Sequence, residues 1–132
     1  MTAPELNIPD VVAEVRAAFD RYDHGLDVND VAVLDDSFWD SPHTLRYGVG
    51  ENLHGHAAIA AFRASRTPAE HQARARRLEN TLITSFGRDF AVANTEYVIL
   101  SSGRRGRQSQ TWVRMPEGWK VVAAHVSVLP EA

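Results

Sequence analysis

Apolar residues in the first quarter of the chain recur at helical spacing. The stripe starts just after Pro9, a residue that suits the first turn of a helix, and its members lie three or four positions apart. They are Val12, Val15, Phe19, Tyr22 and Leu26. We therefore predict a helix that starts at Pro9 and ends near Gly25, preceded by a flexible arm over residues 1–8.

Two shorter helices are predicted before the middle of the chain. Over residues 29–38, apolar side chains that include Leu34 and Phe38 fall on one helical face. A third helix is expected from about His56, where apolar and Arg side chains share a face. Pro68 is expected to end it, because proline cannot continue a helix.

The remainder of the chain has the patterns of strands. Strands are predicted over residues 38–47, 78–86, 90–100, 108–115 and 119–129. Short turns join the last four, which favours an antiparallel meander. With three helices in the N-terminal half, this order predicts an α+β fold, in which the helices pack on one curved antiparallel sheet. The 132 residues suit a single domain spanning residues 1–132.

Composition narrows the classes of function. The chain has 14 basic and 17 acidic residues, a net charge of −3, so we expect no nucleic-acid or membrane partner. The absence of Cys excludes disulfides, thiol nucleophiles and Cys-ligated zinc. His54 and His56 offer two metal ligands without a third, so no metal site is predicted. There is no apolar membrane span and no signal-peptide pattern, and we expect a cytoplasmic protein.

Tyr22 and Arg46 are the first candidates for a site. A buried phenol such as Tyr22 needs a hydrogen-bond partner, which is either the protein's own backbone or a molecule in a pocket. Arg46 lies in an otherwise uncharged strand segment, and a buried Arg must be paired. Its partner is either an internal carboxylate, with Glu51 and Glu96 as candidates, or the carboxylate of a bound anion. If Arg46 faces the outer side of the sheet, it is simply solvated.

Polar residues in other elements complete the candidate set. Arg66, near the end of the third helix, either reaches the mouth of a pocket or lies along the helix edge. Gln108 and Gln110 share one face of their strand, and His125 and Ser127 share one face of theirs. His exchanges a proton near neutral pH, although a strand His also serves as a structural hydrogen-bonding group. We predict that His125, with Gln110 and Ser127, orients water or substrate.

The chain also resembles a known family. Two helices before the first strand, one after it and a long meander look like the NTF2-like (SnoaL-like, cystatin-related) α+β cone. Five strings narrow this resemblance to the small proteins found beside amidases in oxalurate and cyanuric-acid breakdown. They are residues 38–44, 46–51, 86–90, 106–112 and 124–127. The similarity extends over residues 12–129.

The resemblance implies a function and a site. It implies a cavity between helices and sheet and a small, doubly anionic ureido substrate, with no metal and no organic cofactor. One family member is a 1,3-dicarboxyurea hydrolase, a decarboxylating amidohydrolase that yields allophanate, and we expect that activity here. Tyr22 and Arg46 match positions associated with the family's active site, and Arg66 is expected to help hold substrate.

The resemblance also leaves alternatives. It implies a homodimer formed through the open face of the sheet. The chain is alternatively a non-catalytic partner of an amidase, or another enzyme on the same fold, such as an isomerase, a dehydratase or a cyclase, because one fold hosts many chemistries.

Overall fold

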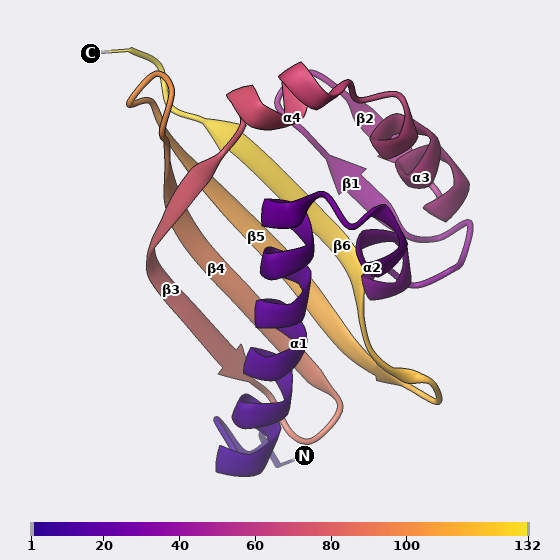
Figure 1. Cartoon of the computed structure of the whole chain (residues 1–132). Helices are drawn as coiled ribbons and strands as arrows, with labels where there is room; N and C mark the ends of the chain where they lie inside the picture. Colours follow the sequence, from indigo (N-terminus) through magenta and orange to yellow (C-terminus); the bar gives the residue numbers. More distant parts are fainter. Residues whose placement is uncertain (1, 132) are drawn as a thin grey trace.

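The computed structural model describes residues 2–131, which form one curved sheet with helices on one face (Figure 1). The helices are α1 (Pro9–Val28), α2 (Val31–Ser37), α3 (His56–Ala64) and α4 (Pro68–Ala73). The strands are β1 (Leu45–Tyr47), β2 (Asn52–His54), β3 (Arg76–Ser85), β4 (Phe90–Ile99), β5 (Arg105–Met115) and β6 (Gly118–Val128). No helix in this described part is long and apolar enough to cross a membrane.

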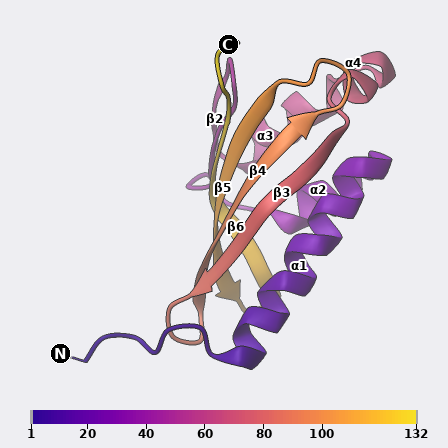
Figure 2. The ribbon, with the colours of Figure 1, turned by 90° about the vertical axis from the view of Figure 1, so that its left-hand side faces the viewer.

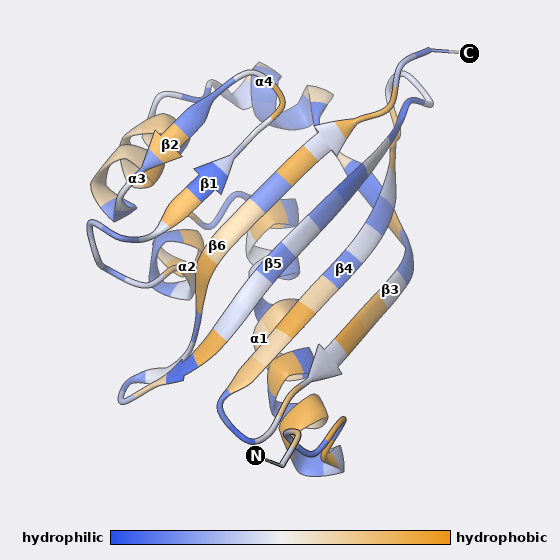
Figure 3. Ribbon diagram, turned by 180° about the vertical axis from the view of Figure 1, so that it is seen from behind, coloured by the Kyte–Doolittle hydropathy of each residue, from blue (hydrophilic) through white to orange (hydrophobic). Residues whose placement is uncertain are grey.

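The sheet has the order β2-β1-β6-β5-β4-β3. All neighbouring strands are antiparallel except β1 and β6, which are parallel. Figure 2 shows α1 lying along one face of the curved sheet, and Figure 3 shows the opposite face without a covering helix. The predicted α+β fold, with three helices in the N-terminal half on a curved sheet, is confirmed. The sheet is mainly rather than wholly antiparallel.

Helix α1 buries its apolar stripe against the sheet. Val15, Phe19 and Tyr22 are all buried, as the spacing predicts. The helix does not end at Gly25 but continues to Val28 and is capped by Asn29, whose φ of 57° places it in the left-handed region. Gly25 has a different role, because a Cβ there would lie only 2.9 Å from Val33 Cγ1 of α2. The glycine permits the close approach of the two helices.

The middle of the chain departs most from the prediction. The strand expected over residues 38–47 is reduced to β1, which forms a hairpin with the unpredicted strand β2. Pro68 does not simply end a helix; it starts α4. The Thr67 side chain accepts a hydrogen bond from the Glu70 backbone N–H, and the Glu70 side chain accepts one from the Thr67 backbone N–H. This capping box stabilises a short fourth helix that apolar spacing does not reveal.

The long strands follow the prediction closely, and their alternation separates two faces. In β5, the side chains of Gln108, Gln110 and Trp112 are buried on the helix-covered face. The last residues of the arm predicted over residues 1–8 contact the sheet. Ile8 is buried, and the Asn7 backbone N–H donates to the Ser85 carbonyl at 3.0 Å. This segment therefore extends the edge of the sheet beside β3.

Candidate active site

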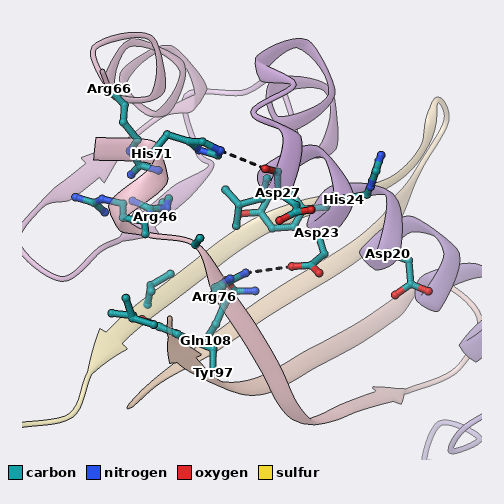
Figure 4. A pocket seen from close by; sticks show the side chains of 16 residues that line it. Asp20, Asp23, His24, Asp27, Arg46, Arg66, His71, Arg76, Tyr97 and Gln108 are labelled. Carbon is teal, nitrogen blue, oxygen red and sulfur yellow. Dashed lines mark hydrogen bonds and ion pairs between the residues drawn. The ribbon is translucent and has the colours of Figure 1, made fainter. Parts of the chain in front are cut away.

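A cavity of about 530 Å³ opens between the C-terminal half of α1, the segment around α4 and the ends of the long strands (Figure 4). Four guanidinium groups line it, and we call it the Arg-lined cavity. They belong to Arg46, Arg66, Arg74 and Arg76. Tyr22, Asp23 and Gln108 contribute to the same lining. A volume of this size suits a small molecule.

Tyr22 and Arg46, the first two candidates from the sequence, both line this cavity. Tyr22 is 5% exposed, and its hydroxyl has no hydrogen-bond partner among the described residues. Arg46, from β1, donates from Nη1 to Glu51 Oε1 at 3.1 Å, and the two side chains are only 13% and 21% exposed. A smaller hollow of about 20 Å³ also adjoins Tyr22 and Arg46, which is room for about one water molecule. Arg46 therefore combines an internal salt bridge with a place in the cavity wall.

Arg66 and Arg74 differ from the other two cavity arginines. Within residues 2–131, neither has a carboxylate oxygen within 4.0 Å. Burial, followed by the positive charges of Arg74 and Arg46, lowers the pKa of Arg66. The Cζ atoms of Arg46 and Arg66 lie 5.7 and 5.5 Å from the centre of the Phe62 ring, which holds both guanidinium groups at the same side of the cavity. Such a cluster of like charges favours an anionic ligand.

Arg76 is fixed by three neighbours on another wall. Its Nη1 donates to Gln108 Oε1 at 3.0 Å, its Nη2 donates to Asp23 Oδ1 at 3.5 Å, and its Cζ lies 5.0 Å from the Tyr97 ring centre. Burial raises the pKa of Asp23, against the opposing effect of Arg76. Burial also raises the pKa of Tyr97. The Tyr97 hydroxyl donates to the Ser127 carbonyl at 2.9 Å.

Gly106 makes the position of the Tyr97 ring possible. The two residues face each other across β4 and β5. A Cβ at Gly106 would lie 2.1 Å from Tyr97 Cζ and 2.5 Å from the Ser127 carbonyl oxygen. Because glycine has no side chain, the Tyr97 ring can lie next to Gly106, where its face also contacts the Arg76 guanidinium.

At the mouth of the cavity, a hydrogen bond connects α1 to α4. His71 Nε2–H donates to the Asp27 carbonyl at 3.2 Å (Figure 4). The exposed side chains of Asp20 and Asp27 lie at this rim, in contact with solvent. Solvent screens their charges more strongly than it screens the charges in the wall.

Three predicted site residues do not line the cavity. His125 and Ser127 project from the outer face of β6, while Val126 between them lines the cavity. His125 is exposed and packs its ring edge to face with Tyr47 at 5.8 Å. Apolar Val126 turns inward because the inner face of β6 lies under the helices. Gln110 faces inward but is buried in the core, with 1% of its surface exposed. Its neighbour on the same face, Gln108, lines the cavity instead. His125, Gln110 and Ser127 therefore do not line this cavity, and their role in orienting water or substrate stays a prediction.

Sequence reasoning missed Asp23, Arg74 and Arg76. One signal was available, because Arg74, Arg76 and Arg77 form a basic run immediately before a predicted strand. No sequence pattern shows that α1 brings Asp23 to Arg76, which is 53 positions away.

Similar proteins are found among family models and solved structures. A family model described as AtzH-like matches residues 4–132. A DUF3225-family protein of unknown function from Pectobacterium atrosepticum is 54% identical, with a TM-score of 0.89 and 95% of each chain covered. A cystatin-like fold protein from Burkholderia xenovorans is 44% identical, with a TM-score of 0.89 over 98% of this chain and 99% of that one. An NTF2-like superfamily protein from Salmonella enterica is 25% identical, with a TM-score of 0.72 over 93% and 94% of the two chains. No curated protein matches the chain.

Proposed function

The chain belongs to the AtzH-like family of NTF2-like proteins, and from this premise we propose that it is a small decarboxylating amidohydrolase. Its substrate is a dicarboxylated urea, with 1,3-dicarboxyurea as the leading candidate and allophanate and carbon dioxide as products. The proposal combines the family with the chemistry of the Arg-lined cavity, because fold alone does not select a reaction.

The charge balance of the cavity is the observation that carries the proposal. Glu51 and Asp23 compensate Arg46 and Arg76, whereas Arg66 and Arg74 have no carboxylate partner in the described part of the chain. A ligand with two carboxylates supplies the two missing negative charges. Guanidinium groups bind carboxylates through paired, charge-assisted hydrogen bonds. The cavity thus attracts a small dianion although the protein's net charge is −3.

The proposed chemistry needs one proton and no redox partner. A proton reaches the nitrogen that carries the departing carboxylate, the bond between that nitrogen and the carboxylate carbon breaks, and its electron pair stays on nitrogen. One 1,3-dicarboxyurea dianion and one proton then give one allophanate anion and one carbon dioxide. Hydration of the carbon dioxide to bicarbonate and a proton makes the overall reaction a hydrolysis, in which one water is consumed. In this proposal Tyr22 passes the proton; its hydroxyl has no hydrogen-bond partner among residues 2–131, and the adjoining hollow has room for the water that would restore the proton.

A turnover assay tests this function. The purified protein is mixed with 1,3-dicarboxyurea, and release of carbon dioxide and allophanate is followed for wild type, Arg46→Ala and Tyr22→Phe. We expect activity in the wild type, its loss in Arg46→Ala, and a reduction of about a hundredfold in Tyr22→Phe. Arg88→Ala serves as a control, because the Arg88 side chain is 65% exposed and its one salt bridge within residues 2–131 is with Asp10. Its activity should match the wild type.

The assay also separates the alternatives. A folded wild-type protein that releases no carbon dioxide contradicts the proposed activity and favours the amidase-partner hypothesis, which co-purification with an amidase then tests. An isomerase, dehydratase or cyclase would leave this substrate untouched. The homodimer through the open sheet face stays a prediction, which the mass of the protein measured in solution by light scattering tests.

A further inference from the structure

The cavity wall around Arg76 contains hydrogen-bond donors and acceptors that have no partner within residues 2–131. Four elements meet there: α1 supplies Asp23, and the sheet supplies Arg76, Tyr97 and Gln108 from three strands. Figure 4 shows Asp23 directed at Arg76, with Gln108 below them. We call the trio of Asp23, Arg76 and Gln108 the amide wall. Its side chains are held by one another, which fixes the directions of the groups that remain free.

Two donors in the amide wall have no acceptor. Arg76 Nε and Gln108 Nε2 are buried and lack a hydrogen-bond partner among residues 2–131. Gln108 is 3% exposed, and its Oε1 already accepts from Arg76, so the amide nitrogen is the group left over. Buried donors are normally satisfied in native proteins. Both nitrogens are shielded from water in the empty protein, so a ligand carbonyl oxygen reaches them only if the lining side chains move on binding, and it would then supply the missing acceptor.

An acceptor stands beside these donors. The Asp23 carboxylate receives a single long contact of 3.5 Å from Arg76 and has no other hydrogen bond in the described chain. An ionised carboxylate has room for about four hydrogen bonds, so most of its capacity is free. The same side chain is 35% exposed, and burial raises its pKa, so its ionised form is less well solvated than a carboxylate on the open surface.

From this juxtaposition we propose that the amide wall recognises the –NH–CO– edge of a ureido group. Gln108 and Arg76 donate to the carbonyl oxygen, and Asp23 accepts from the neighbouring N–H. This role is separate from the attraction of carboxylates by Arg66 and Arg74. It rests on the proposed function only for the identity of the natural substrate, and it defines the class of ligand as ureido acids rather than dicarboxylates in general.

Two stable acids of the same shape test the role of the N–H group. Ureidoacetate and 4-oxopentanoate share a chain length, a carboxylate and a carbonyl, and they differ in carrying N–H groups or C–H groups beside that carbonyl. We expect calorimetry to show that the wild type binds ureidoacetate at least about tenfold more tightly, because a site built for an N–H group rejects the analogue without it. Equal affinities overturn the proposal.

Two variants divide the wall into its acceptor and its donor. In Asp23→Asn, the amide oxygen still accepts from Arg76, but the amide N–H group now faces the ligand N–H, so two donors meet. The preference for ureidoacetate should therefore fall by about tenfold. In Gln108→Leu, both ligands lose a donor to their shared carbonyl, so both should bind about tenfold more weakly with little change in their ratio. Asp10→Asn on the same helix is the control for charge, because Asp10 is 67% exposed and pairs with Arg88. It should leave both affinities unchanged.

The outcomes distinguish this inference from a purely structural role. If the trio only holds the fold together, Asp23→Asn will change both affinities alike, and that result overturns the proposal. Circular dichroism of the unliganded variants reports their folding, and the wild-type ratio decides the matter if a variant does not fold. Loss of the proposed function leaves a different signature, in which 1,3-dicarboxyurea is not turned over although ureidoacetate is still preferred.

Discussion

Replacing Glu51 with glutamine should strengthen anion binding while it destabilises the empty protein. Glu51 Oε1 lies 3.1 Å from Arg46 Nη1, and glutamine retains an oxygen at that position, so the guanidinium keeps an acceptor. The exposed Gly50 N–H, which donates to Glu51 Oε2 at 3.2 Å, then turns to water. The negative charge is lost. A ligand carboxylate on the other edge of Arg46 would lie roughly 6 Å from Glu51, and their repulsion amounts to about 0.7 kcal/mol in a water-like medium and about 2.8 kcal/mol near a protein surface.

This repulsion converts to an increase in affinity of about three- to hundredfold for an anion such as glutarate. The unliganded variant should lose about 1–2 kcal/mol, because a largely buried Arg loses its counter-charge, and its melting temperature should fall by about 3–10 °C.

Calorimetric titration with glutarate at low salt and thermal unfolding without ligand measure the two effects. Glu117→Gln, in an exposed turn, makes the same change of charge at a site remote from Arg46 and should change neither value. Weaker glutarate binding in Glu51→Gln would refute the reasoning, because the carboxylate would then serve the ligand by orienting Arg46 rather than compete with it.

Two further predictions concern the cavity wall. Burial raises the pKa of Asp23 above its ordinary value of 3.8, so the carboxyl group ionises less readily in the native state than in the unfolded chain. The unfolding free energy of the wild type, compared with that of Asp23→Asn, should therefore fall as pH rises from 3 to 7. Urea titrations at the two pH values measure this, and a relative gain for the wild type would contradict the assignment. Gly106→Ala places a Cβ 2.1 Å from Tyr97 Cζ and should lower the unfolding free energy by about 3 kcal/mol. Gly50→Ala, with no atom within 4 Å of the new Cβ, is its control, and equal losses in the two variants would contradict the packing argument.

Much of the fold could be predicted from local pattern. The stripe of α1 and the alternation of β3 to β6 repeat over several turns or pairs of residues, so each element carries its own signal. Short elements carry less. β1 and β2 have three residues each, too few for a period, and α4 depends on a capping box rather than on an apolar face.

Part of the candidate site could also be predicted. Tyr22 was found because it interrupts an apolar stripe with a polar group, and Arg46 because it interrupts an uncharged strand. Both line the cavity. His125 was misplaced, since alternation tells which residues share a face but not which face the helices cover. The inward position of Val126 is decided by the packing of the whole sheet.

The sequence by itself therefore determined the class of fold, the inventory of long elements and the residue types from which a site could be built. Only the tertiary structure decided which of those residues meet. Asp23, Arg76 and Gln108 come from separate parts of the chain. Their contacts depend on the register of the strands and on the position of α1 on the sheet. Local preferences act over a few residues, whereas the charge balance of a cavity depends on groups joined only by the complete fold.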